Sequence, residues 1–86
     1  MVVSSEIPEK LNIGAILRHY KGGLYEFVSS ATLESTGEEV AVYCNYFTGK
    51  KWVRPMKEMF DYVKYRTPNP TGQTFRFQVV ENLFDN

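Results

Sequence analysis

The side chains best suited to nucleophilic chemistry in this sequence are its one cysteine, Cys44, and its one histidine, His19. A cysteine–histidine dyad needs a thiolate in an accessible, electropositive site beside the imidazole. Cys44 instead falls in phase with Val40 and Val42 in an alternating, strand-like stretch. Free cysteine in such a setting is usually a small buried residue. We therefore expect Cys44 to belong to the core and no dyad to form.

Other catalytic arrangements lack the residues that they need. One histidine and one cysteine cannot supply the ligands of a metal site. The glutamates fall at turns or at solvent-facing strand positions, where burial would not shift a carboxyl pKa for acid–base catalysis. Gly22-Gly23 is not followed by a helix whose amide groups would bind phosphate. We expect no enzyme, no metal and no cofactor; a hydrolase with His19 as general base is the remaining catalytic alternative.

A set of aromatic and basic residues near the expected turns is better suited to recognition. Aromatic rings offer flat faces to prolines, methylated ammonium groups or bases. We expect a groove that binds a peptide or protein partner, formed by His19, Tyr20, Lys21, Tyr43, Tyr46, Trp52 and Arg54. Aromatic rings also fill the cores of small domains. On that ground Trp52 and Tyr25 are expected in the core, whereas Tyr20 and Tyr46 suit either role.

A second binding hypothesis is single-stranded RNA or DNA. Its phosphate contacts would be Arg18, His19, Lys21, Lys50, Lys51 and Arg54. Ten basic and ten acidic residues leave a formal net charge of zero, whereas nucleic-acid binders usually carry a basic excess. This hypothesis therefore requires the acidic groups to lie on the opposite face.

The elements that would position these residues are short strands separated by turns. The chain of 86 residues has the length of one domain. Residues 1–12 read as an N-terminal arm, with a short helical turn from Glu9 as the alternative, residues 13–80 as the domain and residues 81–86 as a tail. Strands are expected over 14–19, 24–33, 39–47, 51–54, 61–65 and 75–80, with one 3₁₀ or helical turn over 55–60 and an irregular loop over 67–72. The strand over 39–47 is expected at the centre, because both of its faces carry apolar or aromatic groups.

Short strands, tight turns and a single helical turn predict a mainly β fold. The best match is a small SH3-like barrel of five or six short strands with one 3₁₀ or helical turn. An OB-fold fits less well, because it usually contains a longer helix between its third and fourth strands. A single cysteine suits a reducing compartment, and neither a signal peptide nor an apolar run of about 20 residues is present. We therefore expect a cytoplasmic protein without a membrane partner.

Several short motifs resemble the DUF1653 family of small uncharacterised domains. They are Arg18-His19-Tyr20-Lys21-Gly22, Leu24-Tyr25-Glu26, Thr36-Gly37-Glu38, Val42-Tyr43, Trp52-Val53-Arg54-Pro55, Met59-Phe60 and Phe75-Arg76-Phe77. They occur in the family's order over about residues 14–78, and the loop over 67–72 departs from its pattern. The resemblance implies a compact β-barrel and brings no catalytic residues with it.

Overall fold

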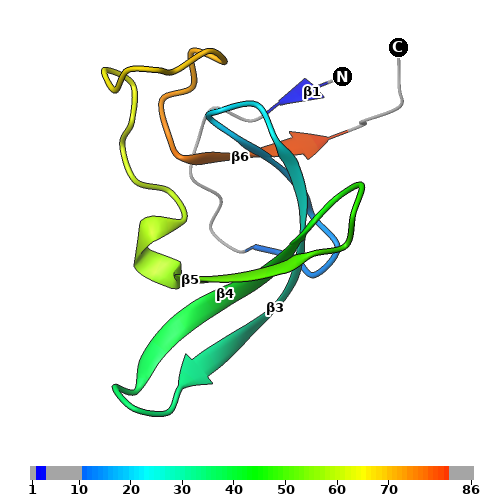
Figure 1. Ribbon diagram of the computed structural model, residues 1–86, viewed down its shortest axis with the longest axis vertical. Coiled ribbons are helices and arrows are strands. Elements are labelled where there is room, and N and C mark those ends of the chain that lie inside the picture. The colour runs from blue at the N-terminus through cyan, green and yellow to red at the C-terminus, as the bar shows by residue number, and fades with distance from the viewer. Residues whose placement is uncertain (1, 4–10, 82–86) are drawn as a thin grey trace.

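The computed structural model describes residues 2–3 and 11–81, and this part of the chain forms one antiparallel sheet (Figure 1). The expected helical turn from Glu9 and the tail after residue 81 lie outside the described residues. The strands are β1 (Val2–Val3), β2 (Ile16–His19), β3 (Leu24–Leu33), β4 (Glu38–Asn45), β5 (Lys51–Pro55) and β6 (Phe77–Glu81). Their order across the sheet is β1-β6-β2-β3-β4-β5.

Tight turns join the consecutive strands β2, β3 and β4 where the sequence predicts them. Gly22 has a φ of 108°, and its amide donates to the carbonyl of His19 at 2.8 Å. Gly37 has a φ of 75°, and its amide donates to the carbonyl of Leu33 at 2.7 Å. Both values lie in the region that glycine adopts without steric cost. The expected turns of both hairpins are confirmed.

The sheet curves because its longest strand, β3, bends between the part that pairs with β2 and the part that pairs only with β4. β3 pairs with β2 near its start and with β4 along most of its length, and its register shifts between Phe27 and Ser29. A bulge of this kind bends a strand and increases its twist. After β5 a 3₁₀ turn, η1 (Met56–Glu58), leads into residues 59–76, which return the chain to β6 beside β2.

The predicted mainly β fold with short strands and one 3₁₀ turn is confirmed. The return of β6 to β2 after the 3₁₀ turn is the connection expected of an SH3-like barrel. Among the described residues the sheet is open, with β1 and β5 at its two edges. In the same part of the chain no helix is long and apolar enough to cross a membrane.

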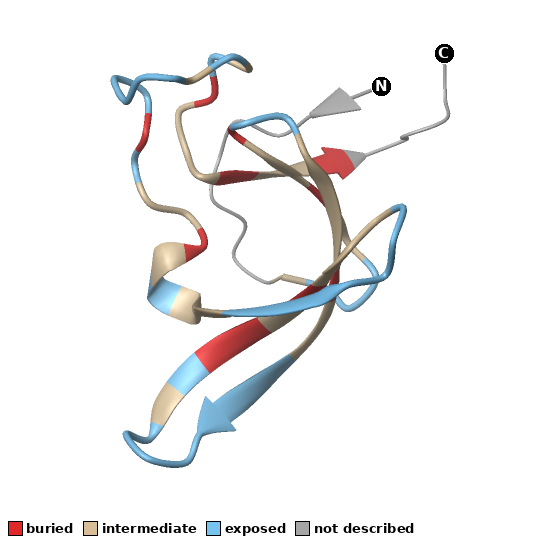
Figure 2. Ribbon diagram, viewed as in Figure 1, coloured by how far each residue is buried: buried red, intermediate tan, exposed pale blue. Residues whose placement is uncertain are grey.

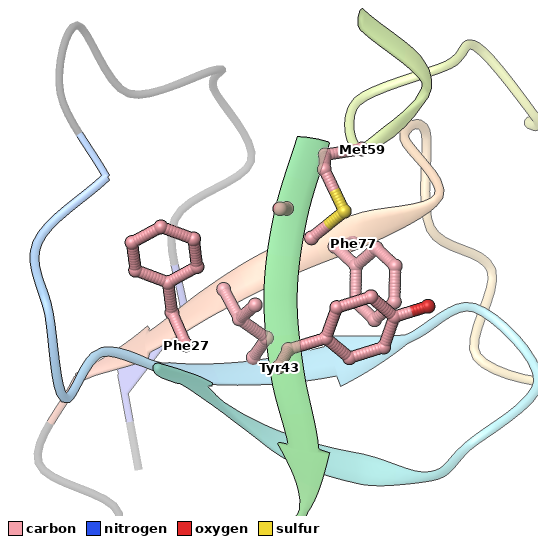
Figure 3. Close-up of a cluster of buried hydrophobic side chains, with 6 residues drawn as sticks. Phe27, Tyr43, Met59 and Phe77 are labelled. Carbon is pink, nitrogen blue, oxygen red and sulfur yellow. The ribbon is translucent and has the colours of Figure 1, made fainter. Parts of the chain in front are cut away.

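Aromatic rings dominate the core, which lies on the inner side of the curved sheet (Figures 2 and 3). The buried side chains that form its central cluster are those of Leu17, Phe27, Ala41, Tyr43, Met59 and Phe77. The Phe77 ring meets the ring of Tyr43 nearly edge-on, with 5.2 Å between centroids, and that of Tyr25 at 5.8 Å. Edge-on contacts of this kind are favourable beyond the area that they bury. Tyr25, expected in the core, is half-buried and packs against this cluster.

The expected strand over residues 61–65 is wrong. Only an isolated bridge between Tyr62 and Phe75 forms there. Two backbone bonds flank this bridge, from the Val63 amide to the Thr74 carbonyl at 2.7 Å and from the Arg76 amide to the Asp61 carbonyl at 2.8 Å. A local turn follows at once, in which the amide of Arg66 donates to the carbonyl of Val63 at 2.9 Å. The side chain of Asn69 also donates to the Val63 carbonyl, at 3.1 Å. These bonds close the segment on itself and leave no register for a ladder.

Two expected core residues lie elsewhere. Trp52 is 43% exposed, because β5 is an edge strand and no further strand covers the ring on that side in the described chain. Cys44 is only half-buried and lies outside the core cluster, because it points to the face of β4 opposite to Tyr43. β4 is an inner strand as expected, although it ends at Asn45. The pairing of Val2–Val3 with β6 within the supposed arm was not predicted.

The positions of Phe77 and Trp52 predict opposite responses to truncation. Phe77→Ala should lower the free energy of unfolding by about 3–5 kcal/mol, the usual cost of removing a buried ring. Trp52→Ala should lower it by only about 1 kcal/mol, because the side chain is already 43% exposed and removing it leaves no enclosed cavity. Urea unfolding followed by circular dichroism measures both. Equal losses for the two variants would contradict the placement of Trp52 at the edge.

Candidate functional site

The two residues with nucleophilic or base chemistry lie on opposite faces of the sheet. His19 is directly opposite Phe77 and therefore shares the inner face with it. Cys44 alternates with the inward-pointing Tyr43 and so lies on the outer face. The chain therefore brings together no Cys44–His19 dyad. Among the described residues no group of three or more His, Cys, Asp or Glu side chains could hold a metal ion.

His19 is enclosed by aromatic rings and cations. Its ring centroid lies 4.7 Å from that of Tyr20 and 5.0 Å from that of Phe77, and its Nδ1 accepts a hydrogen bond from the Lys21 amide at 3.1 Å. Burial lowers the pKa of His19 from 6.5 to about 4, with further lowering by the charges of Arg76, Arg54 and Lys21, in that order. The imidazole is therefore neutral near pH 7. It carries no charge for a phosphate and is too weak a base for efficient proton abstraction at that pH.

Tyr20 and Tyr43 do not lie on the surface as members of an open groove. Their exposed fractions are 5% and 6%. Tyr43 belongs to the core cluster, and Tyr20 lies beneath the Lys21 ammonium, 5.7 Å from its ring centroid. The Arg76 guanidinium lies 6.0 Å from the same centroid. These two tyrosines are therefore packing residues beneath the surface. The seven residues of the expected groove do not form one open surface.

Arg54 is committed to neighbours inside the protein. Its Nη1 lies 3.1 Å from a carboxylate oxygen of Glu58, which follows it by four residues. Desolvation tends to lower the pKa of Arg54, but the Tyr43 hydroxyl and the Glu58 carboxylate together raise it. Its buried Nε makes no hydrogen bond within the described part of the chain. Arg54 therefore stabilises the passage from β5 to the 3₁₀ turn and presents little free charge.

A cluster of aromatic rings surrounds the turn between β4 and β5, in which Phe47 and Trp52 are exposed and Tyr46 is half-buried. We call this the hairpin surface, formed by Tyr46, Phe47, Lys50 and Trp52. Phe47 is 78% exposed and its ring meets that of Tyr46 edge-on at 5.2 Å. The Lys50 ammonium lies 4.5 Å from the Trp52 ring centroid, within the range of a cation–π contact. Sequence reasoning included Tyr46 and Trp52 and missed Phe47, which it placed inside a strand.

The turn that carries the hairpin surface is held in one conformation. The side-chain carbonyl of Asn45 accepts the amides of Phe47 and Thr48, each at 2.9 Å. The hydroxyl of Thr48 accepts the amide of Lys50 at 3.2 Å. An asparagine that bonds the backbone ahead of it is a common device of tight turns. The exposed rings therefore project from a backbone that is already ordered.

β5 presents an open backbone edge beside this surface, and Figure 2 shows it exposed over much of its length. The Asn45 amide donates to the Lys50 carbonyl at 2.8 Å, so these two residues form a hydrogen-bonded pair. This pair determines which of the following residues of β5 bond to β4. In an antiparallel pair every second residue bonds to the neighbouring strand. Trp52 and Arg54 therefore bond to β4, and the amides and carbonyls of Lys51 and Val53 point away from the sheet.

A second group of exposed rings was missed because it lies in the segment that was expected to be a strand. Tyr62 is 56% exposed and Tyr65 is 81% exposed. The sequence signal was present, because two aromatic and two basic residues occur within the five positions 62–66. The segment was expected to be a strand, whereas in the structure it is a loop with exposed tyrosines.

The fold and these surfaces define a small, mainly β domain that presents aromatic and basic residues at its turns. The family model described as "Protein of unknown function (DUF1653)" matches residues 15–79, most of the chain. The chain belongs to the DUF1653 family, and the resemblance found in the sequence is confirmed. Neither the curated proteins nor the solved structures contain a match.

The low pKa of His19 has a measurable consequence for stability. The unfolded chain takes up a proton near the ordinary value of 6.5, whereas folded His19 does so only near 4. Stability that is present above pH 6.5 is therefore lost as the pH falls from 6.5 towards 4, and this loss ends once the folded state is protonated too. An NMR titration of the single imidazole should give a midpoint near 4.

His19→Gln is the matched control for this titration. The carboxylates also titrate at low pH, but the difference in stability between wild type and variant isolates the histidine. That difference should change between pH 6.5 and 4 and stay constant above it. A midpoint near 6.5 in the folded protein would contradict the enclosed position of the ring.

Proposed function

We propose that this protein is a small, non-catalytic, SH3-like binding module that takes up an extended segment of a protein partner along the open edge of β5. The observation that carries the proposal is the edge itself. β5 carries outward-pointing backbone groups at Lys51 and Val53. It also carries two exposed apolar side chains, Trp52 with an exposed fraction of 43% and Val53 with one of 61%. Addition of a strand to such an edge uses main-chain bonds for affinity and side-chain contacts for specificity.

The edge has features that favour one partner strand over indiscriminate pairing. Exposed, flat, apolar edges pair readily with other chains, and proteins commonly limit them with charge or proline. Lys51 stands at the start of β5 and Pro55 at its end. Pro55 offers no amide to a docking strand, so pairing stops after Val53. The strand that docks is therefore short.

The charge next to the edge indicates the chemistry of the partner. Lys50 and Lys51 are both exposed at the start of β5, and the Lys50 ammonium already covers the Trp52 ring. Arg54 and Lys57 are paired with Glu58 and Glu38. The free positive charge therefore lies at one end of the strand. We propose that the partner segment carries an acidic residue there and an apolar residue opposite Trp52.

The nucleic-acid hypothesis loses three of its six phosphate contacts. Arg18 donates to the side chains of Gln73 and Gln78, each at 2.9 Å, Arg54 pairs with Glu58, and His19 is neutral near pH 7. A peptide partner for the β5 edge is therefore the better proposal for the residues selected from the sequence. The single free cysteine, Cys44, supports a further proposal that the protein works in the reducing cytoplasm.

The test uses peptides selected from a displayed random library on the immobilised domain. When a selected peptide binds the ¹⁵N-labelled protein, the amide resonances of Lys51 and Val53 should shift. These two amides point outward, so the peptide should also protect them from hydrogen exchange. The amides of Trp52 and Arg54, already bonded to β4, should change much less. Trp52→Ala should weaken binding by at least about 2 kcal/mol, or roughly thirtyfold, if the ring is the central anchor.

Leu33→Ala is the matched control. Leu33 is 44% exposed, almost the same as Trp52, but it lies at the far end of β3 beside the β3–β4 turn. Its truncation should leave peptide affinity unchanged. Failure to select any peptide, or shifts that avoid β5 in every complex, would overturn the proposal.

A further inference from the structure

We propose that the loop of residues 61–66 is a second binding site, for single-stranded nucleic acid, distinct from the β5 edge and not part of the function proposed above. We call this segment the tyrosine loop. It lies in the return from η1 to β6, at the end of the molecule opposite to the β3–β4 turn (Figure 1).

Two exposed rings are the first observation. The rings of Tyr62 and Tyr65 have centroids 6.1 Å apart and planes inclined by 57°. Their exposures of 56% and 81% leave ring surface open to solvent. An 86-residue domain that fills its core with aromatic rings has left these two outside. Stacking of a base on such a ring is the usual basis of single-strand binding that does not depend on sequence.

The backbone beneath the rings is anchored, which is the second observation. Val63, between the two tyrosines, is 1% exposed, and its amide donates to the Thr74 carbonyl at 2.7 Å. The Asn69 side chain donates to the carbonyls of Val63 and Gln73, at 3.1 and 2.9 Å. The loop therefore does not need to order itself on binding, which lowers the entropic cost of association.

Positive charge surrounds the rings, which is the third observation. Lys64 and Arg66 are exposed, and the Lys64 ammonium lies 5.8 Å from the centroid of Tyr65. The nearby carboxylate, Asp61, is already engaged by Arg76 at 3.1 Å. The exposed Lys21 lies on the β2–β3 turn, which hydrogen bonds tie to the segment that follows the loop.

Acidic residues are concentrated elsewhere. Glu34, Glu38 and Glu39 lie in or beside the β3–β4 turn, at the bottom of Figure 1, whereas the tyrosine loop lies near the top. The whole chain carries ten basic and ten acidic side chains, so the positive charge at the tyrosine loop is local. Half of the acidic side chains of residues 11–80 therefore lie away from the loop, and Asp61, within it, is paired with Arg76.

Exposed rings together with exposed cations favour single-stranded nucleic acid over other polyanions as the ligand. A single strand offers bases for Tyr62 and Tyr65 and phosphates for Lys64 and Arg66. The bases of a duplex are stacked on each other and cannot reach the rings. An acidic peptide would satisfy the cations but leave the ring faces unused.

Fluorescence anisotropy with labelled oligothymidylate and oligouridylate at low salt tests the proposal. Tyr65→Ala should weaken binding roughly five- to 150-fold, the range found when a stacking ring is removed. Tyr65→Phe, which keeps the ring, should retain most of the affinity. Lys64→Gln should reduce the slope of log affinity against log salt by about 0.7, because one phosphate contact is lost.

Ile13→Ala is the control for a general effect of truncating an exposed side chain, because Ile13 is 77% exposed and lies outside the loop. It should bind as the wild type does, and amide spectra of all variants should show the same fold. The proposal is overturned if no oligonucleotide binds at low salt, or if Tyr65→Ala binds normally. Equal affinity for a duplex, heparin or polyglutamate would also overturn it, because each binds charge without offering free bases.

Discussion

The packing of Phe77 against Tyr43 is the interaction on which the rest of this structure depends. It joins β6 to β4, two strands that β2 and β3 separate in the sheet, with 5.2 Å between ring centroids. Tyr25 and His19 meet the same Phe77 ring from β3 and β2. Without this cluster the long return from β5 would have no apolar surface on which to close. Large rings are needed because a domain of this size has few residues with which to fill its interior.

This core also decides which groups are left for function. Tyr20 and Tyr43 are buried in the packing that closes the sheet and His19 is half-buried beside Tyr20, so these rings leave little surface for a ligand. The low pKa of His19 is a consequence of the same enclosure. Among residues 11–80 the exposed aromatic side chains lie beyond the core, at the β4–β5 turn, along the β5 edge and in the tyrosine loop. Binding is therefore proposed at the periphery of the sheet, and its interior serves stability.

Local sequence signals predicted the hairpins well. The glycine positions and the period of two in residues 24–33 and 39–45 are sufficient to find β3, β4 and the turns between them. They could not show that β5 is an edge strand, because strand order depends on long-range pairing. Trp52 was therefore expected in the core, although the edge leaves it exposed. The strand expected over 61–65 failed for a different reason, since a turn and side-chain bonds from Asn69 end the pairing after one bridge, and the local sequence does not reveal such bonds.

The central claim is that β5 offers free backbone groups to a partner strand, and amide hydrogen exchange in the unliganded domain tests it most directly. The amides of Trp52 and Arg54 should be protected by their bonds to β4, and those of Lys51 and Val53 should exchange rapidly. Alternating protection along β5 would support an open docking edge. Equal protection of all four amides would show that the edge is already covered, and would contradict the account.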